Sequence, residues 1–162
     1  MKRYSLAAAT FAAGFIAAQG ALAATQTSSL DVNASVTSVC AINSTTALAF
    51  GEVGLTGATP GQGTVAVTCT QGGLYTVGLD NGVNAVGAQR AIASGTNKLN
   101  YNLYSDAELT TAWTGTGAGL VSGTGNAQEQ DLTVYGNIPT GQTLISGNGT
   151  PYTDVVQVTV TY

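Results

Sequence analysis

The chain has 162 residues, a net charge of −4 at pH 7, 22 glycines and no histidine. Histidine is the commonest general base and the usual partner of a serine or cysteine nucleophile, so its absence argues against an enzyme. The negative charge argues against a nucleic-acid partner. We expect a protein that is not an enzyme and that uses no cofactor and no metal.

Residues 1–23 have the pattern of a secretion signal. Lys2 and Arg3 precede an apolar run at residues 6–18, and Ala21-Leu22-Ala23 is a small-x-small cleavage site. We place the cut between Ala23 and Ala24. The apolar run is shorter than the roughly 20 residues of a membrane span. We therefore expect an exported protein without a membrane span.

The chain that remains after this cleavage has 139 residues, because 23 of 162 are removed. Its only cations are Arg90 and Lys98, which stand against eight carboxylates and give a net charge of −6. Single domains commonly hold about 100 to 150 residues. We expect one domain.

The first segment after the leader alternates apolar and polar residues, which is the period-2 pattern of a strand with one buried face. This pattern fits the first strand of a complete sandwich, and it also fits a spare strand that pairs elsewhere. The apolar face continues through Ser38 and Cys40, and we set the end of the segment near Thr37. Its apolar positions are Leu30, Val32, Ala34 and Val36.

Cys40 and Cys69 are the only cysteines of the chain. An even number in an exported protein predicts a disulfide rather than a metal site or a reactive thiol. Two buried free thiols are the alternative. Closing a loop of roughly 30 residues stabilises a fold by about 3 to 4 kcal/mol in the chain-entropy description.

The centre of the chain is rich in Gly, Thr, Val, Ser and Asn and predicts short strands at the spacing of a β-sandwich. Turns are expected at Asp80-Asn81-Gly82 and Pro139-Thr140-Gly141. Residues 114–126 favour a loop or a weakly held edge. The predicted strands carry Val65, Val67 and Cys69; Tyr75, Val77 and Leu79; Leu99, Tyr101 and Leu103; and Leu132 and Val134.

Two acidic pairs are candidates for a glycosidase-like site, because carboxylates two residues apart on a strand share a face. They are Asp106 with Glu108 and Glu129 with Asp131. Their polar surroundings favour solvated surface instead. Trp113 is a candidate for stacking on a sugar, but a single Trp more often packs in a core.

The last ten residues, 153–162, again predict a strand with one buried face. No further strand follows it in the sequence, while a spare strand pattern stands just after the leader. This pairing suggests a protein that polymerises. The apolar side carries Val156, Val158, Val160 and Tyr162, opposite Val155, Gln157, Thr159 and Thr161.

Four segments taken together resemble the spore coat protein U domain family, which includes subunits of archaic chaperone-usher pili. The resemblance covers essentially the whole chain after the leader. The segments are the alternating stretch that leads to Cys40, residues 99–106 continuing to Trp113, residues 134–142, and residues 152–162.

The resemblance implies an immunoglobulin-like β-sandwich that lacks its last strand and is completed by donor-strand exchange. Residues 24–37 are then the donor segment and residues 38–162 the pilin domain. The disulfide between Cys40 and Cys69 would tie the first strand of the domain to the second. Leu30, Val32, Ala34 and Val36 would fill a groove bordered by Val156, Val158, Val160 and Tyr162 of the next subunit.

The partners implied by the resemblance are a periplasmic chaperone, an outer-membrane usher and further pilin subunits in a homopolymer, with the fibre at the cell surface. We favour a major pilus subunit that supports adhesion and biofilm formation, since a tip adhesin needs a further receptor-binding domain. A secreted spore-coat or matrix protein with the same fold is the second interpretation. An extracellular carbohydrate-binding module or hydrolase is the third.

Overall fold

The structure is a computed structural model that describes residues 24–162, so the predicted leader lies outside the described residues. Two units are distinguished, one up to Ala34 and one from Ser35 to Tyr162. Residues 24–39 form neither helix nor strand, although a strand was expected from Leu30 to Val36. A single strand has no stability of its own without a pairing partner.

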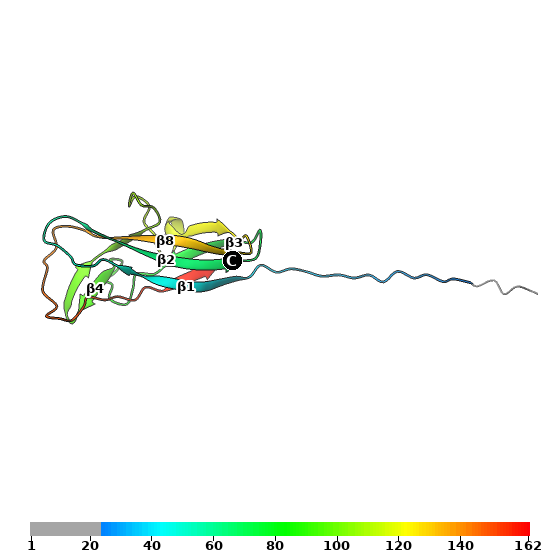
Figure 1. Cartoon of the computed structure of the whole chain (residues 1–162), viewed down its shortest axis with the longest axis horizontal. Helices are drawn as coiled ribbons and strands as arrows, with labels where there is room; N and C mark the ends of the chain where they lie inside the picture. Colours follow the sequence, from blue (N-terminus) through cyan, green and yellow to red (C-terminus); the bar gives the residue numbers. More distant parts are fainter. Residues whose placement is uncertain (1–23) are drawn as a thin grey trace, which may run out of the picture. The chain divides into compact units, whose positions relative to one another are not determined.

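The unit from Ser35 to Tyr162 is built from antiparallel strands (Figure 1). One sheet has the order β1-β2-β8-β6, a second has the order β7-β3-β9, and β4-β5 is a separate hairpin. The strands are β1 (Cys40–Ala49), β2 (Thr59–Cys69), β3 (Leu74–Leu79), β4 (Ala91–Ser94), β5 (Asn97–Asn100), β6 (Asn102–Tyr104), β7 (Val121–Thr124), β8 (Glu129–Ile138) and β9 (Val158–Thr161), with one 3₁₀ turn, η1 (Gly117–Gly119).

The two sheets bury their inner faces against one another, which gives the expected all-β, immunoglobulin-like sandwich. The predicted strands around Val67, Val77 and Val134 are confirmed as β2, β3 and β8. Their alternating apolar residues fill the core because successive side chains of a strand point to opposite faces. Core residues from both sheets include Val65, Val67, Tyr75, Val77, Leu79, Leu103, Val134 and Ile138.

Trp113 lies in the middle of this core with 1% of its surface exposed. Its indole Nε1–H donates a hydrogen bond of 2.9 Å to the carbonyl of Val77 in β3. Burying an indole is favourable only when the N–H finds an acceptor. The side chain therefore packs the sandwich and is not available to stack on a sugar.

The strand predicted over residues 99–104 is divided at Tyr101. β5 pairs with β4, whereas β6 pairs with β8 of the first sheet. At the break the Tyr101 amide donates to the carbonyl of Arg90, and the Tyr101 carbonyl accepts from the Gln89 side chain at 2.9 Å. The apolar alternation continues across the break, but the hydrogen-bonding partner changes.

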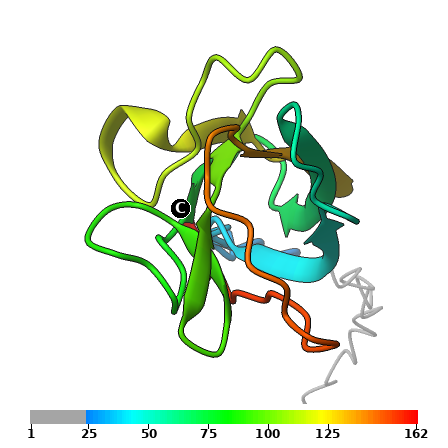
Figure 2. The same cartoon turned by 90° about the vertical axis from the view of Figure 1, so that its left-hand side faces the viewer.

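The strand predicted over residues 153–162 is shorter than expected, because regular pairing covers only β9. Before β9 the chain makes separate contacts with different neighbours, beginning with an isolated bridge between Thr153 and Ala93. Asp80 replaces a regular ladder bond, since its carboxylate accepts the Gln157 amide at 2.8 Å. The hairpin β4-β5 and the segment before β9 lie at the same end of this unit (Figure 2).

Residues 114–126 were expected to be a loop or an edge, and the structure places η1 and β7 there. β7 is the outer strand of the second sheet, paired with β3 alone. The expectation is confirmed.

Candidate functional site: a groove between two strand edges

A groove with a volume of about 1170 Å³ runs along the unit from Ser35 to Tyr162. The end of β1 forms one wall, and the segment leading into β9 forms the other. Buried side chains of the core, among them Val65, Leu103 and Val134, form its floor. The groove is mostly apolar because it opens directly onto the space between the two sheets.

Among the residues that the structure describes, none pairs with one backbone edge of the β9 wall. Its backbone bonds to the segment that follows β3 come from odd-numbered residues. The Asp80 amide donates to the Gln157 carbonyl at 3.0 Å, and the Val83 amide donates to the Val155 carbonyl at 3.1 Å. Backbone groups of an antiparallel strand alternate in direction, so the even-numbered residues point to the other side. These are Asp154, Val156, Val158 and Val160.

β1 has a free edge as well, because β1 and β9 are the outermost strands of their sheets. Both strands line the groove. An unpaired strand edge beside an apolar cleft is a template for an extended chain. The groove therefore offers both hydrogen-bonding groups and apolar surface to one additional strand.

The end of β1 reaches over the first sheet through a register shift between Thr46 and Ala49. Leu48 and Phe50 then lie against Gly61 and Gly136, which pair with each other across β2 and β8. A Cβ at either glycine would meet these side chains at 3.0 Å or less. The missing side chains thus create the room that Leu48 and Phe50 occupy.

Tyr101 and Asp154 connect the floor of the groove to its β9 wall. The Tyr101 hydroxyl donates to Asp154 Oδ2 at 2.7 Å, and the Asn84 amide donates to Asp154 Oδ1 at 3.0 Å. Burial of the phenol and its hydrogen bond to Asp154 raise the pKa of Tyr101. The hydroxyl therefore keeps its proton as a donor at physiological pH.

Arg90 supports the same region from beneath. Its guanidinium donates to the carbonyls of Leu79 at 2.6 Å and Asp80 at 2.8 Å, where β3 ends. The side chain is 6% exposed, and burial lowers its pKa. These bonds satisfy a buried cation with backbone dipoles.

Comparison with known proteins shows the family to which this chain belongs. The family profile of the Spore Coat Protein U domain matches residues 26–159. The chain belongs to the Spore Coat Protein U domain family. Protein U of Myxococcus xanthus is 32% identical to this chain over 176 aligned positions, which cover 98% of this chain and 97% of Protein U. The resemblance found in the four sequence segments is confirmed.

The fold of this Spore Coat Protein U domain is similar to that of a solved structure. It is the CsuC-CsuE chaperone-tip adhesion subunit pre-assembly complex from archaic chaperone-usher Csu pili of Acinetobacter baumannii. The match has a TM-score of 0.53 and 22% sequence identity, and it covers 78% of this chain and 40% of the solved chain. At this identity the likeness concerns the fold alone.

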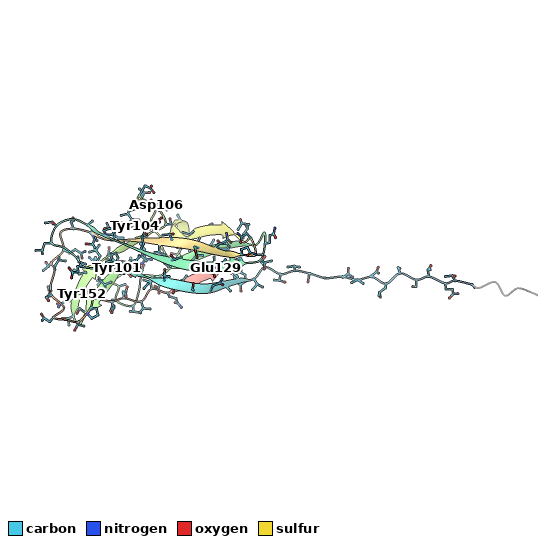
Figure 3. The ribbon with its side chains drawn as sticks, in the orientation of Figure 1. Tyr101, Tyr104, Asp106, Glu129 and Tyr152 are labelled. Carbon is cyan, nitrogen blue, oxygen red and sulfur yellow. A yellow bond between two sulfur atoms is a disulfide. The ribbon has the colours of Figure 1, made fainter. Side chains whose placement is uncertain are left out.

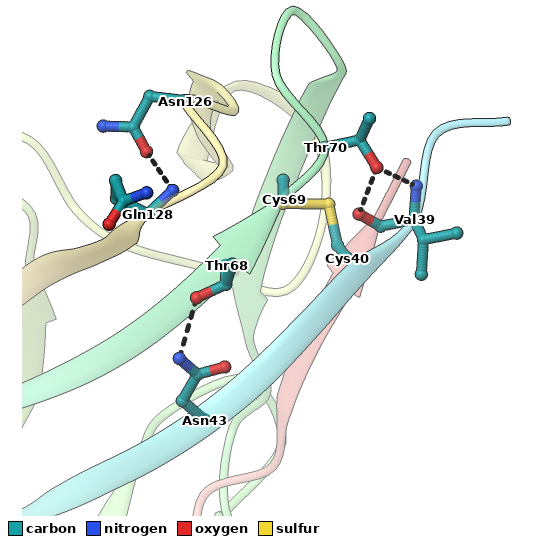
Figure 4. Close-up of a disulfide and its surroundings, with 8 residues drawn as sticks. All are labelled: Val39, Cys40, Asn43, Thr68, Cys69, Thr70, Asn126 and Gln128. Atoms are coloured by element: carbon teal, nitrogen blue, oxygen red, sulfur yellow. Dashed lines mark hydrogen bonds between the residues drawn. A yellow bond between two sulfur atoms is a disulfide. The ribbon is translucent and has the colours of Figure 1, made fainter. Parts of the chain in front are cut away.

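The predicted disulfide of this Spore Coat Protein U domain is confirmed, since Cys40 and Cys69 are bonded (Figure 4). It joins opposite residues of β1 and β2 whose Cα atoms are 4.1 Å apart. Directly before it, the Thr70 amide donates to the Val39 carbonyl at 2.9 Å, and the Thr70 hydroxyl accepts from the Val39 amide at 3.1 Å. The start of β1 is therefore fastened to the end of β2.

The residues predicted to border the acceptor groove fall into two groups. Val156 and Val158 line the groove. Val160 is half-buried against the core, and Tyr162 is 60% exposed; neither lines the groove. Sequence reasoning did not single out Leu48 and Phe50, although their spacing of two residues is itself a strand signal.

The residues predicted to form the donor segment are exposed in the single chain. The exposed fractions are 87% for Leu30, 84% for Val32 and 86% for Val36, and Ala34 is exposed as well. Their assignment as a donor segment stays a prediction. Ala24 is the first described residue and Ala23 lies outside the described range, so the cleavage site remains a prediction.

The two predicted acidic pairs lie in different surroundings, and Figure 3 labels one residue of each, Asp106 and Glu129. Asp106 and Glu108 follow β6 and do not lie on a strand, whereas Glu129 and Asp131 lie on β8 and are exposed. Asp106 lies in the loop after β6 and accepts bonds from Thr110 and Thr111, whereas Glu129 starts β8 and accepts a 2.6 Å bond from Asn43. Across residues 24–162 no group of three or more His, Cys, Asp or Glu residues is placed to hold a metal ion. Over the same described range, no helix has the length and apolar character to cross a membrane.

Proposed function

We propose that this Spore Coat Protein U domain is a subunit of a surface fibre of the chaperone-usher type. Residues 24–37 of one copy would occupy the groove between β1 and β9 of the next copy. The observation that supports this most directly is the 1170 Å³ groove between two strand edges. The same chain carries an alternating apolar segment that forms no strand in the described range, residues 24–162.

The donor segment has the chemistry that the groove requires. Burying Leu30, Val32 and Val36 contributes about 1.5 to 3 kcal/mol for each side chain, and Ala34 contributes less. Each sheet hydrogen bond adds about 0.5 to 1.5 kcal/mol net. Ordering a flexible strand costs about 1 to 2 kcal/mol per residue. The net free energy is a difference between large terms, so the durability of a fibre would be largely kinetic.

In the same proposal, the open apolar groove determines which partners the subunit needs on its way to the cell surface. A periplasmic chaperone would lend a strand to the groove, because an unfilled groove with free edges invites aggregation. An outer-membrane usher would then exchange that strand for the donor segment of the next subunit. In this proposal the leader at residues 1–23 directs export, and the homopolymer at the cell surface supports adhesion and biofilm formation.

A secreted spore-coat or matrix protein is the second candidate function. The match to Protein U, which extends over nearly all of both chains, favours it. The same groove and donor segment would then link copies in a layer rather than a fibre. Electron microscopy of cells with and without the gene distinguishes a fibre from a layer.

The test of strand donation compares two changes in the same segment. Val32→Asp places a carboxylate on the face that enters the groove, where burial of an unpaired charge is unfavourable. Asn33→Asp adds the same charge on the opposite face. We expect Val32→Asp to stop polymerisation and Asn33→Asp to leave fibre length unchanged, as measured by electron microscopy and size-exclusion chromatography. Normal polymers of Val32→Asp would contradict the proposal.

A further inference from the structure

Tyr101 lies in the floor of the groove and contacts both of its walls. Its side chain is 4% exposed and belongs to the groove floor. Its ring lies edge-on to Phe50, directly after β1, with 5.8 Å between the ring centroids. Its hydroxyl reaches Asp154 on the opposite wall at 2.7 Å. Tyr101 therefore joins the β1 wall to the β9 wall across the floor.

Asp154 is the residue of the β9 wall that is held to the interior by its side chain rather than by its backbone. Thr153 and Val155 are attached through their backbones to Ala93 and Val83. Asp154 has its backbone turned to the open edge, so its carboxylate is what ties this residue to the interior. Gly82, at φ +79°, lies so close to the carboxylate that a Cβ would collide with it. The site is thus shaped around the Asp154 side chain.

An empty apolar groove is expected to narrow unless something keeps its walls apart. Removing apolar surface from water is favourable, and facing walls gain dispersion contacts when they approach. A strand that must reopen the groove before it binds pays for that reorganisation. A link that contacts both walls and the floor prevents such narrowing.

We propose that Tyr101 is a positioning residue that braces the empty groove through Phe50 on one side and Asp154 on the other, so that the walls keep the separation an incoming strand needs. This inference rests on the proposed function, because it concerns the same groove. The inference assigns a role in this groove to Tyr101, which is neither one of the predicted donor-segment residues nor one of the predicted groove-bordering residues.

The test uses the full chain after leader cleavage and a fluorescent peptide with the sequence of residues 24–37, present in large excess. Tyr101→Phe removes the hydroxyl bond to Asp154 and keeps an aromatic ring beside Phe50. If the competent open form then falls to about a tenth of the population, apparent affinity falls about tenfold. The loss should appear in the association rate, with dissociation unchanged, because the bound strand itself holds the walls.

Asp154→Asn is the second variant and keeps the volume of the side chain. When two residues act through one shared contact, the effect of the double variant is smaller than the sum of the effects of the two single variants. We therefore expect Tyr101→Phe combined with Asp154→Asn to slow association no more than the slower single variant. Tyr104→Phe is the matched control, because Tyr104 lies on β6 and does not line the groove. Amide exchange at Thr153 and Gln157, whose N–H groups donate hydrogen bonds on either side of Asp154, should rise in the two brace variants and stay unchanged in Tyr104→Phe.

The outcomes separate the brace from the function on which it rests. Slower association in the brace variants, with Tyr104→Phe at the wild-type rate, supports the brace. Peptide binding to the wild type, with brace variants associating at the same rate, overturns the brace and leaves strand donation intact. Failure of the wild type to bind the peptide overturns both.

Discussion

Gly61 of β2 and Gly136 of β8 lie opposite one another in the first sheet, and the side chains of Leu48 and Phe50 pack over the pair. Neither glycine has a positive φ, so the reason for glycine here is space rather than backbone conformation. The pair lets the end of β1 lie close to the sheet. It thereby fixes the depth of the groove at the β1 wall.

Gly136→Ala tests this relationship. The new Cβ would lie within 3.0 Å of Leu48 and Phe50, and overpacking commonly costs about 1 to 3 kcal/mol. The displaced side chains would move into the groove, so we expect lower stability and weaker polymerisation. Chemical denaturation and fibre counts measure the two effects.

Gly54→Ala is the control for that substitution, since its nearest contact would be 3.7 Å away at Thr56. We expect its free energy of unfolding to stay within about 0.5 kcal/mol of the wild type. Equal effects of Gly136→Ala and Gly54→Ala would show that the contact with Leu48 and Phe50 is unimportant.

Removing the disulfide should destabilise the domain. Replacing Cys40 and Cys69 with Ala opens a connection between residues 29 apart in sequence. Loss of a native disulfide from a small exported domain typically costs about 2 to 5 kcal/mol. We expect a lower denaturation midpoint for the double variant, and the same midpoint for wild type treated with a reductant. Reductant should not change the denaturation midpoint of the double variant, because the variant has no disulfide to reduce. If reductant still lowered that midpoint, the destabilisation of the wild type by reductant would not come from the disulfide.

The loop after β6 should lose order at low pH. Hydrogen bonds from the Thr110 hydroxyl and amide, and then from Thr111, lower the pKa of Asp106 from 3.8 to about 2. A folded-state pKa below the unfolded value stabilises the fold above the unfolded pKa, and this contribution disappears as pH falls toward the folded pKa. The sensitive window is therefore between about pH 4 and pH 2.

Amide exchange at Thr110 and Thr111, followed from pH 5 to pH 2, measures this effect. We expect protection to fall within the window in the wild type. In Asp106→Asn protection should be low throughout and independent of pH in this range, because Asn does not titrate there. A wild-type loop with unchanged protection at pH 2 would refute the role of Asp106.

Local alternation in the sequence predicted the strands whose inner faces fill the core. Val65 and Val67 on β2, and Val77 on β3, are examples, because side-chain direction in a strand depends only on the parity of the position. The even number of cysteines likewise predicted the disulfide, since the oxidising compartment decides the outcome. These features need no knowledge of which strands are neighbours.

Strand partners, by contrast, were decided by the tertiary structure. The predicted strand through Tyr101 divides because β5 and β6 pair with different neighbours. Pairing before β9 is interrupted because the Asp80 carboxylate, rather than a backbone carbonyl, accepts the Gln157 amide. The bond between Tyr101 and Asp154 joins residues 53 apart. The alternation of residues in the sequence determines on which face of a strand a side chain lies. Long-range hydrogen bonds and close packing determine which strands and side chains that face contacts.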